Sequence, residues 1–262
     1  MNGESPTWIG PEWPAPARVR VLSTLRTGGV STGRYASLNL ALHVGDDPTA
    51  VAENRRRLRM AARLPAEPLW LEQVHGARVV ANVAPRAPGD APPQADACMA
   101  TEPGRVCAVM TADCLPVVFS DRAGTCVAVA HAGWRGLAGG VLEATVAALK
   151  TPPTELLAWL GPAIGPAAFE VGAEVREAFL GRCEACAAAF TPNAAGRYQA
   201  DLYALTRTAL SALDVTAVFG GGWCTHRQAE AFFSFRRDRD TGRMATLAWL
   251  DGMLGPHANP TA

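Results

Sequence analysis

The stretch TADCLPVVFSDRAGTCVAVAHAGWRG, residues 111–136, holds two apolar runs on either side of a short polar segment. That segment, Asp121 to Gly124, has the composition of a type I turn closed by glycine, so the two runs are predicted to pair as a β-hairpin. A turn centred in this segment places Cys114 opposite His131. Cross-strand partners on one face have Cβ atoms roughly 4.5–5.5 Å apart, which lets the thiol and the imidazole share a metal ion or a hydrogen bond.

A cysteine beside a single histidine allows three interpretations. The two residues can be buried without a function, since free cysteine is commonly a core residue. They can also be a nucleophile with its base, or two of the ligands of a metal ion. A third group near the pair is needed to choose among these interpretations.

The composition is that of a compact globular protein. Of the 262 residues, 49% are hydrophobic and 18% are charged, which excludes an intrinsically disordered chain. The formal net charge is zero, so no global field attracts nucleic acid or a membrane surface, and neither is expected as a partner. No signal peptide is visible, and no segment approaches ~18 uninterrupted apolar residues, so a cytoplasmic location is predicted. The odd count of seven cysteines argues against a disulfide scaffold.

Predicted strands and helices are mixed along the chain, and many strands follow one another directly. This order predicts one α+β domain over residues 1–262. The predicted architecture is a mixed β-sheet sandwich flanked by helices, with an N-terminal extension at 1–13 and a C-terminal tail at 253–262. The predicted strands are Val19–Leu25, Pro68–Leu71, Arg78–Val83, Val106–Met110, Val117–Ser120, Thr125–Ala130, Leu156–Leu160, Val215–Phe219 and Met244–Leu250. The predicted helices are Pro48–Leu64, Leu137–Lys150, Ala173–Leu180 and Leu202–Leu213, and the proline-rich segment Pro85–Pro93 is a predicted surface loop.

A candidate for the third group is His75, which lies in LEQVHGARVV between two predicted strands. The words QVHG, TADCLPV and HAGWRGLAGGVLE, together with SLNLALHVGDDP, LGPAIGPAAFEVG and FFSFRRDRDTGRMA, closely resemble a bacterial family called multicopper polyphenol oxidase or laccase-domain proteins. Members are also described as purine nucleoside phosphorylases and as peptidoglycan editing factors. The resemblance runs from about Pro14 to Leu250, and it implies that His75, Cys114 and His131 hold one zinc ion.

One thiolate and two imidazoles with a fourth position open are the ligands of a catalytic zinc site, whereas structural zinc usually has four protein ligands. A zinc of this kind lowers the pKa of a bound water to about 7 and polarises the attacked centre. The resemblance implies phosphorolysis of adenosine, inosine and methylthioadenosine, and deamination of adenosine to inosine. The first hypothesis is therefore a monomeric zinc enzyme that acts on purine nucleosides with phosphate.

Four further residues are assigned roles around this site. Arg55 matches a helical asparagine-arginine motif of the family. This match predicts that Arg55 is a catalytic residue that binds phosphate or the substrate. Ser37 and Asn39 in SLNL are predicted contacts of ribose or phosphate. Asp113, beside the thiolate ligand, is predicted to orient an imidazole, because metal-bound histidines usually need a hydrogen-bond partner on the other ring nitrogen.

Other chemistry stays open for the same residues. A metal-free amidase would use His131 to activate Cys114, with a wrongly assembled cell-wall precursor as substrate, and the family's fold resemblance to the cytotoxic-necrotizing-factor-like cysteine hydrolases supports it. A single copper ion can replace zinc, giving a polyphenol oxidase, because thiolate and imidazole accept either metal. A four-copper centre is excluded by five histidines without a His-x-His pair. A metal-stabilised interaction protein is the non-enzymatic alternative.

A second cysteine pair, Cys183-x-x-Cys186, lies in the alanine-rich segment CEACAAAF. A zinc site of this kind would require a second C-x-x-C motif, which the sequence lacks. A structural role is therefore the favoured interpretation for Cys183 and Cys186.

Overall fold

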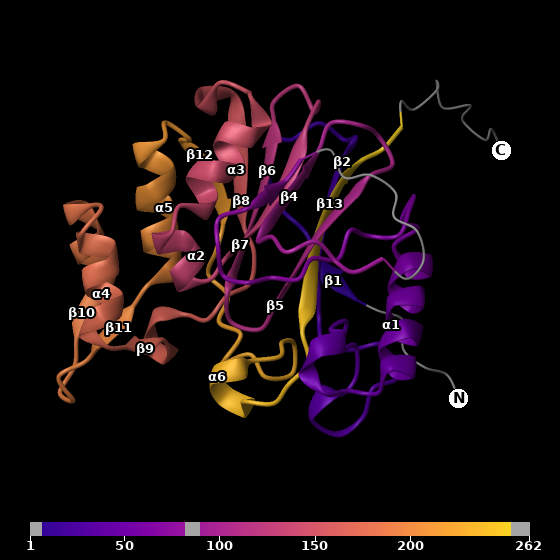
Figure 1. Ribbon diagram of the computed structural model, residues 1–262, viewed down its shortest axis with the longest axis horizontal. Coiled ribbons are helices and arrows are strands. Elements are labelled where there is room, and N and C mark those ends of the chain that lie inside the picture. Colours follow the sequence, from indigo (N-terminus) through magenta and orange to yellow (C-terminus); the bar gives the residue numbers. More distant parts are fainter. Residues whose placement is uncertain (1–6, 82–89, 253–262) are drawn as a thin grey trace.

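The computed structural model describes residues 7–81 and 90–252, and these contain two larger sheets and one small one (Figure 1). The strands are β1 (Trp8–Ile9), β2 (Val19–Thr24), β3 (Val79–Val80), β4 (Ala97–Ala100), β5 (Val106–Thr111), β6 (Leu115–Asp121), β7 (Val127–Ala132), β8 (Leu156–Leu160), β9 (Glu170–Val171), β10 (Phe190–Pro192), β11 (Tyr198–Ala200), β12 (Ala217–Gly220) and β13 (Met244–Leu250). The α-helices are α1 (Pro48–Ala61), α2 (Trp134–Ala138), α3 (Val141–Leu149), α4 (Ala173–Leu180), α5 (Leu202–Ala212) and α6 (Phe235–Asp238). The predicted α+β class is confirmed.

The two larger sheets pack face to face. One has the order β12-β8-β6-β7-β4-β3 and the other the order β1-β2-β13-β5. Side chains from both sheets, among them Val118, Val129, Val109 and Ala248, form one buried cluster between them. Apolar side chains on both faces explain why β5, β6, β7 and β8 are buried along their whole length.

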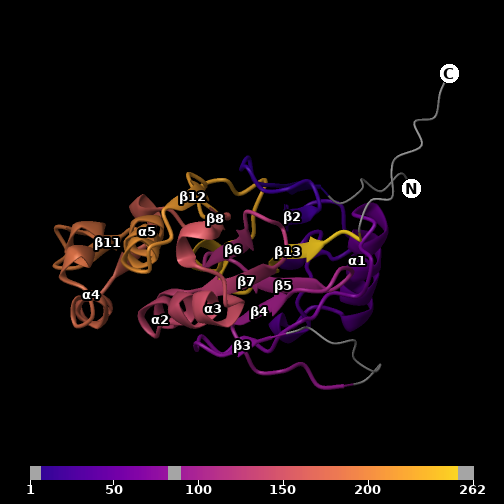
Figure 2. The same cartoon turned by 90° about the horizontal axis from the view of Figure 1, so that it is seen from above.

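Helices cover the two outer faces of this sandwich (Figures 1 and 2). Helices α3 and α5 pack on the six-stranded sheet, and Leu142 and Leu205 belong to the same buried cluster as the strand residue Phe119. Helix α1 places Leu58 against the four-stranded sheet. None of the helices in the described residues combines the length and the apolarity needed to cross a bilayer.

The predicted hairpin forms as β6 and β7, but the predicted register is wrong by two residues. Pro116, not Cys114, pairs with His131. The cause is the Asp121 carboxylate, which accepts hydrogen bonds from the amide and the hydroxyl of Thr125 and holds a longer connection than a four-residue turn. Because alternate residues of a strand share a face, a shift of two leaves Cys114 on the side of His131.

Two other predicted elements differ from the structure. Pro68–Leu71 is not a strand, and Leu69 makes only an isolated bridge with Cys107. The predicted helix at 137–150 begins earlier and is divided into α2 and α3, because Gly140 adopts a left-handed conformation (φ 91°) that ends the first helix.

Some predictions fall at the edges of the described chain. Trp8 and Ile9 belong to the predicted N-terminal extension, yet they form β1 beside β2. The predicted tail at 253–262 lies outside the described residues, as do residues 82–89, which include most of the predicted loop Pro85–Pro93. Strand β4, which the sequence did not predict, pairs with β7.

Candidate metal centre

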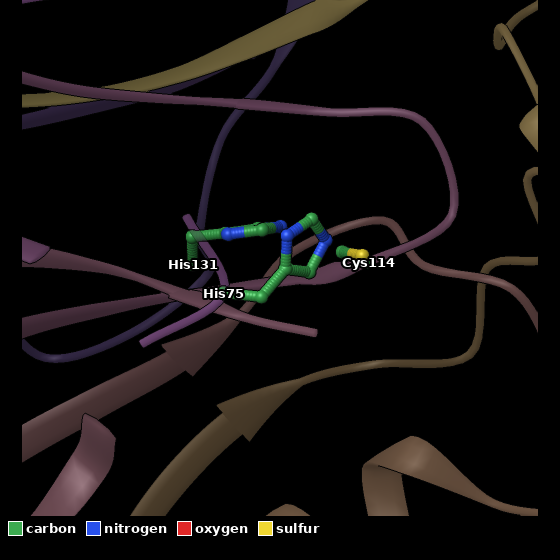
Figure 3. Close-up of side chains that lie close together, drawn as sticks. All are labelled: His75, Cys114 and His131. Atoms are coloured by element: carbon green, nitrogen blue, oxygen red, sulfur yellow. The ribbon is translucent and has the colours of Figure 1, made fainter. Parts of the chain in front are cut away.

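Three side chains from separate segments converge at one end of the six-stranded sheet (Figure 3). His75 lies in the loop before β3, Cys114 immediately precedes β6, and His131 is on β7. Their ligand atoms all lie within 4.8 Å of one another, and the two imidazole centroids are 4.8 Å apart with the rings inclined by 70°. The structure thus brings together the three residues that the sequence assigned to a metal.

Unusual backbone conformations make this convergence possible. His75 and Asp113 have positive φ angles of 60° and 91°, which turn the chain sharply beside each ligand. Gly133 leaves room for the ligands, because a Cβ at this position would lie 2.9 Å from Cys114 Sγ and 3.1 Å from His75 Cδ2. The absence of a side chain at Gly133 therefore gives Cys114 and His75 the space to approach each other.

Asp96, immediately before β4, organises two of the three ligands. Its Oδ1 lies 2.8 Å from His131 Nδ1, so Nδ1 is the protonated nitrogen and Nε2 remains free for a metal or a proton. The same carboxylate accepts hydrogen bonds from the amides of His75 (2.9 Å) and Gly76 (2.7 Å). Asp96 is fully buried, so it holds both histidine-bearing segments from inside the protein.

The predicted role of Asp113 as the partner of an imidazole is therefore wrong. Its Oδ1 accepts a hydrogen bond from the Thr225 hydroxyl at 2.6 Å, and its Oδ2 accepts one from the Arg236 amide at 2.6 Å. Both carboxylate oxygens thus accept hydrogen bonds from the segment between residues 225 and 236. Asp113 instead ties that segment to the chain beside Cys114.

The charges of Cys114 and His131 are coupled. Burial disfavours a thiolate at Cys114, but the charge and hydrogen bond of His131 and the hydrogen bond of His75 outweigh it and lower the pKa to about 6. Burial also disfavours an imidazolium at His131, but Cys114 and Asp96 together raise its pKa to about 9. When no metal is bound, the pair is therefore thiolate and imidazolium between about pH 6 and pH 9.

This coupling predicts the pH dependence of alkylation. In chelator-treated protein, the rate at which iodoacetamide modifies Cys114 should rise with pH and reach half its maximum near pH 6, because only the thiolate reacts. In His131→Ala the midpoint should rise by about 2 pH units or more, since burial then acts without the imidazolium. Mass spectrometry of the Cys114 peptide measures both profiles, and a wild-type midpoint near pH 9 would contradict the ion pair.

A cavity of about 360 Å³ opens above the three ligands, within the range of roughly 300–1,000 Å³ that is usual for small-molecule sites. Arginines and aromatic side chains line it together with the ligands: Arg135, Arg236, Arg239, Arg243, Trp134, Phe169 and Phe235. Arg135 lies over the ring of Trp134, and within the described residues neither its guanidinium nor that of Arg239 donates a hydrogen bond. The cavity thus offers free cationic donors beside aromatic faces.

Arg243 lines the cavity, and its Nη1 donates hydrogen bonds to the carbonyls of Thr241 at 2.7 Å and Gly242 at 3.1 Å. Burial lowers its pKa, whereas the charges of Cys114 and Asp113 raise it, so the guanidinium and the thiolate interact. His43 lines the same cavity, and burial together with the charges of Arg243 and Arg55 lowers its pKa. Arg243 and His43 were not predicted from the sequence as site residues.

The other predicted binding residues, Arg55, Ser37 and Asn39, do not line the cavity. The Arg55 guanidinium donates to the Leu40 carbonyl at 2.8 and 2.9 Å and stacks over the Trp70 ring at 4.1 Å. The Ser37 hydroxyl accepts a hydrogen bond from the Gly29 amide at 3.1 Å. In these conformations the Arg55 and Ser37 side chains bond to the backbone of the chain and do not face phosphate or ribose in the cavity as was predicted.

Asn39 has an indirect connection with the cavity. Its side chain is fully buried, and its Oδ1 accepts hydrogen bonds from the amides of Ala41 and Arg243, both at 3.0 Å. Its amide nitrogen donates to Asp46 at 2.9 Å. Asn39 therefore positions the backbone of Arg243, and its own polar atoms are occupied by the chain.

The donor set fits a single thiophilic metal ion. A thiolate and two imidazoles suit zinc and also copper, and the free Nε2 of His131 is the nitrogen that the Asp96 hydrogen bond leaves available. Metal binding would displace the proton that the thiolate and imidazolium share. Within residues 7–81 and 90–252, this is the one cluster of three or more such ligands, which is too few for a multicopper centre.

Comparison with known proteins gives one family over almost the whole chain. A family model described as multi-copper polyphenol oxidoreductase laccase matches residues 20–251. The chain is 56% identical over 244 residues to a purine nucleoside phosphorylase from Pseudomonas aeruginosa, covering 93% of this chain and 98% of the relative. It is 54% identical over 244 residues to the purine nucleoside phosphorylase YfiH of Escherichia coli, covering 92% and 98%.

Solved structures agree with the fold. A crystal structure of a Neisseria meningitidis protein has a TM-score of 0.89 and 53% identity, covering 94% of this chain and 99% of that one. The crystal structure of YlmD from Geobacillus stearothermophilus has a TM-score of 0.86 and 32% identity, covering 96% and 98%.

Proposed function

Because the chain belongs to the multi-copper polyphenol oxidoreductase laccase family, and its relatives in that family are named purine nucleoside phosphorylases, we propose that it cleaves purine nucleosides with phosphate. The observation that carries the proposal is the cluster of His75, Cys114 and His131 at the base of a cavity lined by arginines and aromatic side chains. Adenosine, inosine and methylthioadenosine are the proposed substrates, and adenosine is also deaminated to inosine.

The cavity residues supply the binding that phosphorolysis needs. A phosphate oxygen attacks C1′ of the ribose, the bond from C1′ to the base breaks, and the base leaves with the electron pair and gains a proton. Arg243, Arg239 and Arg135 hold the phosphate dianion, because guanidinium groups match phosphate oxygens in geometry and charge. The Trp134 and Phe235 rings offer faces for stacking the purine.

His75, Cys114 and His131 would hold the metal, which we propose is zinc, with copper as the alternative. Bound zinc supplies a Lewis acid and lowers the pKa of water to about 7, which is the chemistry that deamination at neutral pH requires. Asp96 keeps His131 in the tautomer that leaves Nε2 free, and Gly133 keeps the space around Cys114 open. The chain thus fixes the ligands before any metal or substrate arrives.

Two arginine variants separate phosphate binding from folding. Arg243→Ala should raise KM for phosphate by about 10–100-fold, the loss expected for a hydrogen bond to a charged group. Arg55→Ala should instead lower the free energy of unfolding by about 1–3 kcal/mol, because Arg55 holds the Leu40 carbonyl and the Trp70 ring. Phosphate-dependent kinetics and denaturant titration measure the two effects. If KM for phosphate rises more in Arg55→Ala than in Arg243→Ala, Arg55 and not Arg243 is the residue that binds phosphate.

A second function has one observation in its favour. Cys114, His131 and Asp96 form a chain of thiolate, imidazolium and carboxylate, which is the order of groups in cysteine hydrolases. In a metal-free amidase, Cys114 would attack a carbonyl carbon and His131 would give its proton to the leaving amine. The proposed substrate of this alternative is a cell-wall precursor. The proposed resemblance of the fold to the cytotoxic-necrotizing-factor-like cysteine hydrolases supports it.

One panel of assays distinguishes these functions. The full-length protein is tested with and without added zinc against adenosine, inosine and methylthioadenosine, each with and without phosphate. Zinc-dependent release of base and ribose-1-phosphate supports the phosphorylase, whereas amidase activity that survives a chelator and is lost with iodoacetamide supports the second function. Absence of nucleoside turnover in metal-loaded protein overturns the first proposal. The cytoplasmic location, the monomeric state and the single domain stay predictions, which fractionation, light scattering and cooperative unfolding test.

A further inference from the structure

A second, smaller cavity of about 130 Å³ contains the cysteine pair that the proposed function does not use. Cys183 and Cys186 both line it, together with apolar side chains of α2, α4 and α5. The 3₁₀-helix η5 (Glu184–Ala189) begins directly after Cys183. Helix α2 also contributes Trp134 and Arg135 to the larger cavity, so the two cavities share one helix.

The backbone holds the two cysteines at a distance that a disulfide can span. The Cys186 amide donates to the Cys183 carbonyl at 3.1 Å, which closes a turn. In such a turn the Cα atoms of the first and fourth residues lie less than about 7 Å apart, which is the limit for a disulfide. Both side chains line this small cavity, and the two thiols interact with each other. The two sulfurs therefore face the same cavity.

The surroundings of the pair favour reaction with a small molecule. Cys183 is partly exposed whereas Cys186 is buried, so one thiol is open to solvent and the second lies behind it. Burial and the neighbouring Cys183 raise the pKa of Cys186 to about 11, and the charge of Arg182 acts in the opposite direction. In the described part of the chain, neither sulfur has a hydrogen-bond partner other than its neighbour. No competing contact has to be broken for the two sulfurs to bond.

Other cysteines of the described chain lack this combination. Cys98 and Cys107 interact with each other, but both are fully buried between the sheets, so an oxidant has no access. Cys224 is partly exposed, but its Sγ accepts a hydrogen bond from the Gly165 amide at 3.3 Å, and it has no cysteine beside it in the chain. The pair at 183 and 186 is therefore the place to test for disulfide exchange.

We propose that Cys183 and Cys186 form a redox-active dithiol that closes into an intramolecular disulfide by exchange with a low-molecular-weight disulfide such as oxidised glutathione. The Cys183 thiolate attacks one sulfur of the external disulfide, and the first glutathione leaves as a thiol. The Cys186 thiolate then attacks the Cys183 sulfur of the mixed disulfide, and the second glutathione leaves. Two protein thiols are oxidised, one external disulfide is reduced to two thiols, and the two protons pass to the glutathione products.

The sequence makes the test simple, because a tryptic peptide from Cys183 to Arg197 contains both cysteines and no other. The full-length protein is equilibrated with mixtures of reduced and oxidised glutathione, alkylated and digested. We expect this peptide to become two hydrogens lighter, without an alkyl group or glutathione, as the oxidised fraction increases. Recovery of the doubly alkylated peptide, or of a peptide that carries glutathione, at the most oxidising mixture overturns the proposal.

The tryptic peptide from Thr208 to Arg227, with Cys224 as its single cysteine, is the internal control. It can take up glutathione but cannot form an internal disulfide. In Cys186→Ser, the peptide that begins at Cys183 should carry glutathione in proportion to the oxidant, because the second exchange step is lost. If that variant peptide resists glutathione under conditions that modify Cys224, Cys183 is not the attacking thiol and the mechanism is wrong.

Discussion

Cys114→Ala is expected to lower both bound metal and kcat/KM for nucleoside phosphorolysis by more than about 100-fold. Loss of a partner that merely orients a ligand typically costs 10–100-fold in metal affinity or activity, and Cys114 is itself one of the three proposed ligands. The variant retains two imidazoles, which leaves too few donors for a tight site. Elemental analysis of the purified variant and phosphate-dependent release of base measure the two losses together.

Cys224→Ala is the matched control, because Cys224 is also partly exposed but lies outside the ligand cluster. It should keep the metal content and turnover of the wild type. Full phosphorolysis in Cys114→Ala would rule out both the metal-dependent reaction and the cysteine nucleophile. If the variant loses its metal but still turns over nucleosides, neither Cys114 nor the metal is needed for the reaction.

The convergence of His75, Cys114 and His131 could be predicted from the sequence because each residue lies in a motif that resembles a known family. The predicted hairpin placed Cys114 near His131 even though its register was wrong by two residues. A shift of one residue would have turned the thiol to the opposite face, whereas a shift of two does not. The prediction of the pair thus depended on the two-residue period of the strand and not on the details of the turn.

The supporting groups could not be predicted in the same way. Asp96 and Asp113 are both acidic residues near a strand start, and only the folded structure decides which carboxylate faces an imidazole. One signal for Asp96 was available, since it is the single charged residue in the apolar stretch QADACMA. A buried carboxylate in such a stretch needs several hydrogen-bond donors, and the turn around His75 provides them.

The arginines show a related limit. Arg55 and Arg243 both lie in segments that match family words, and their sequence surroundings do not reveal where each guanidinium donates. The structure directs Arg55 to the carbonyl of Leu40, a residue fifteen positions earlier. It places Arg243 in the cavity lining, where Nη1 donates to the carbonyls of Thr241 and Gly242 and the charge interacts with Cys114. Long-range packing, which local composition does not encode, decides which cation lines the cavity.

Asp96→Asn is expected to weaken metal binding by about 10–100-fold and to lower the free energy of unfolding by about 3–5 kcal/mol. An amide has one acceptor oxygen, so it cannot accept from His131 and from the amides of His75 and Gly76 together, and its NH₂ group would face another donor. Removal of the carboxylate also removes a cause of the raised pKa of His131. Metal titration with a competing chelator and urea unfolding at pH 7 measure the two changes.

The pH dependence of stability gives an independent check on Asp96. Burial disfavours its charge, but the hydrogen bonds and the charge of His131 outweigh burial and lower its pKa in the folded state. A lowered carboxylate pKa adds stability that is complete above the unfolded value of about 3.9 and is lost as the pH falls through the folded value. The free energy of unfolding of Asp96→Asn should therefore fall less steeply at acid pH than that of the wild type.

Asp121→Asn is the matched control, because Asp121 is also a buried carboxylate and accepts hydrogen bonds in the hairpin connection. This variant should lose stability but keep wild-type metal affinity. Equal loss of metal affinity in both variants would mean that Asp96 acts through general stability and not by holding the histidines.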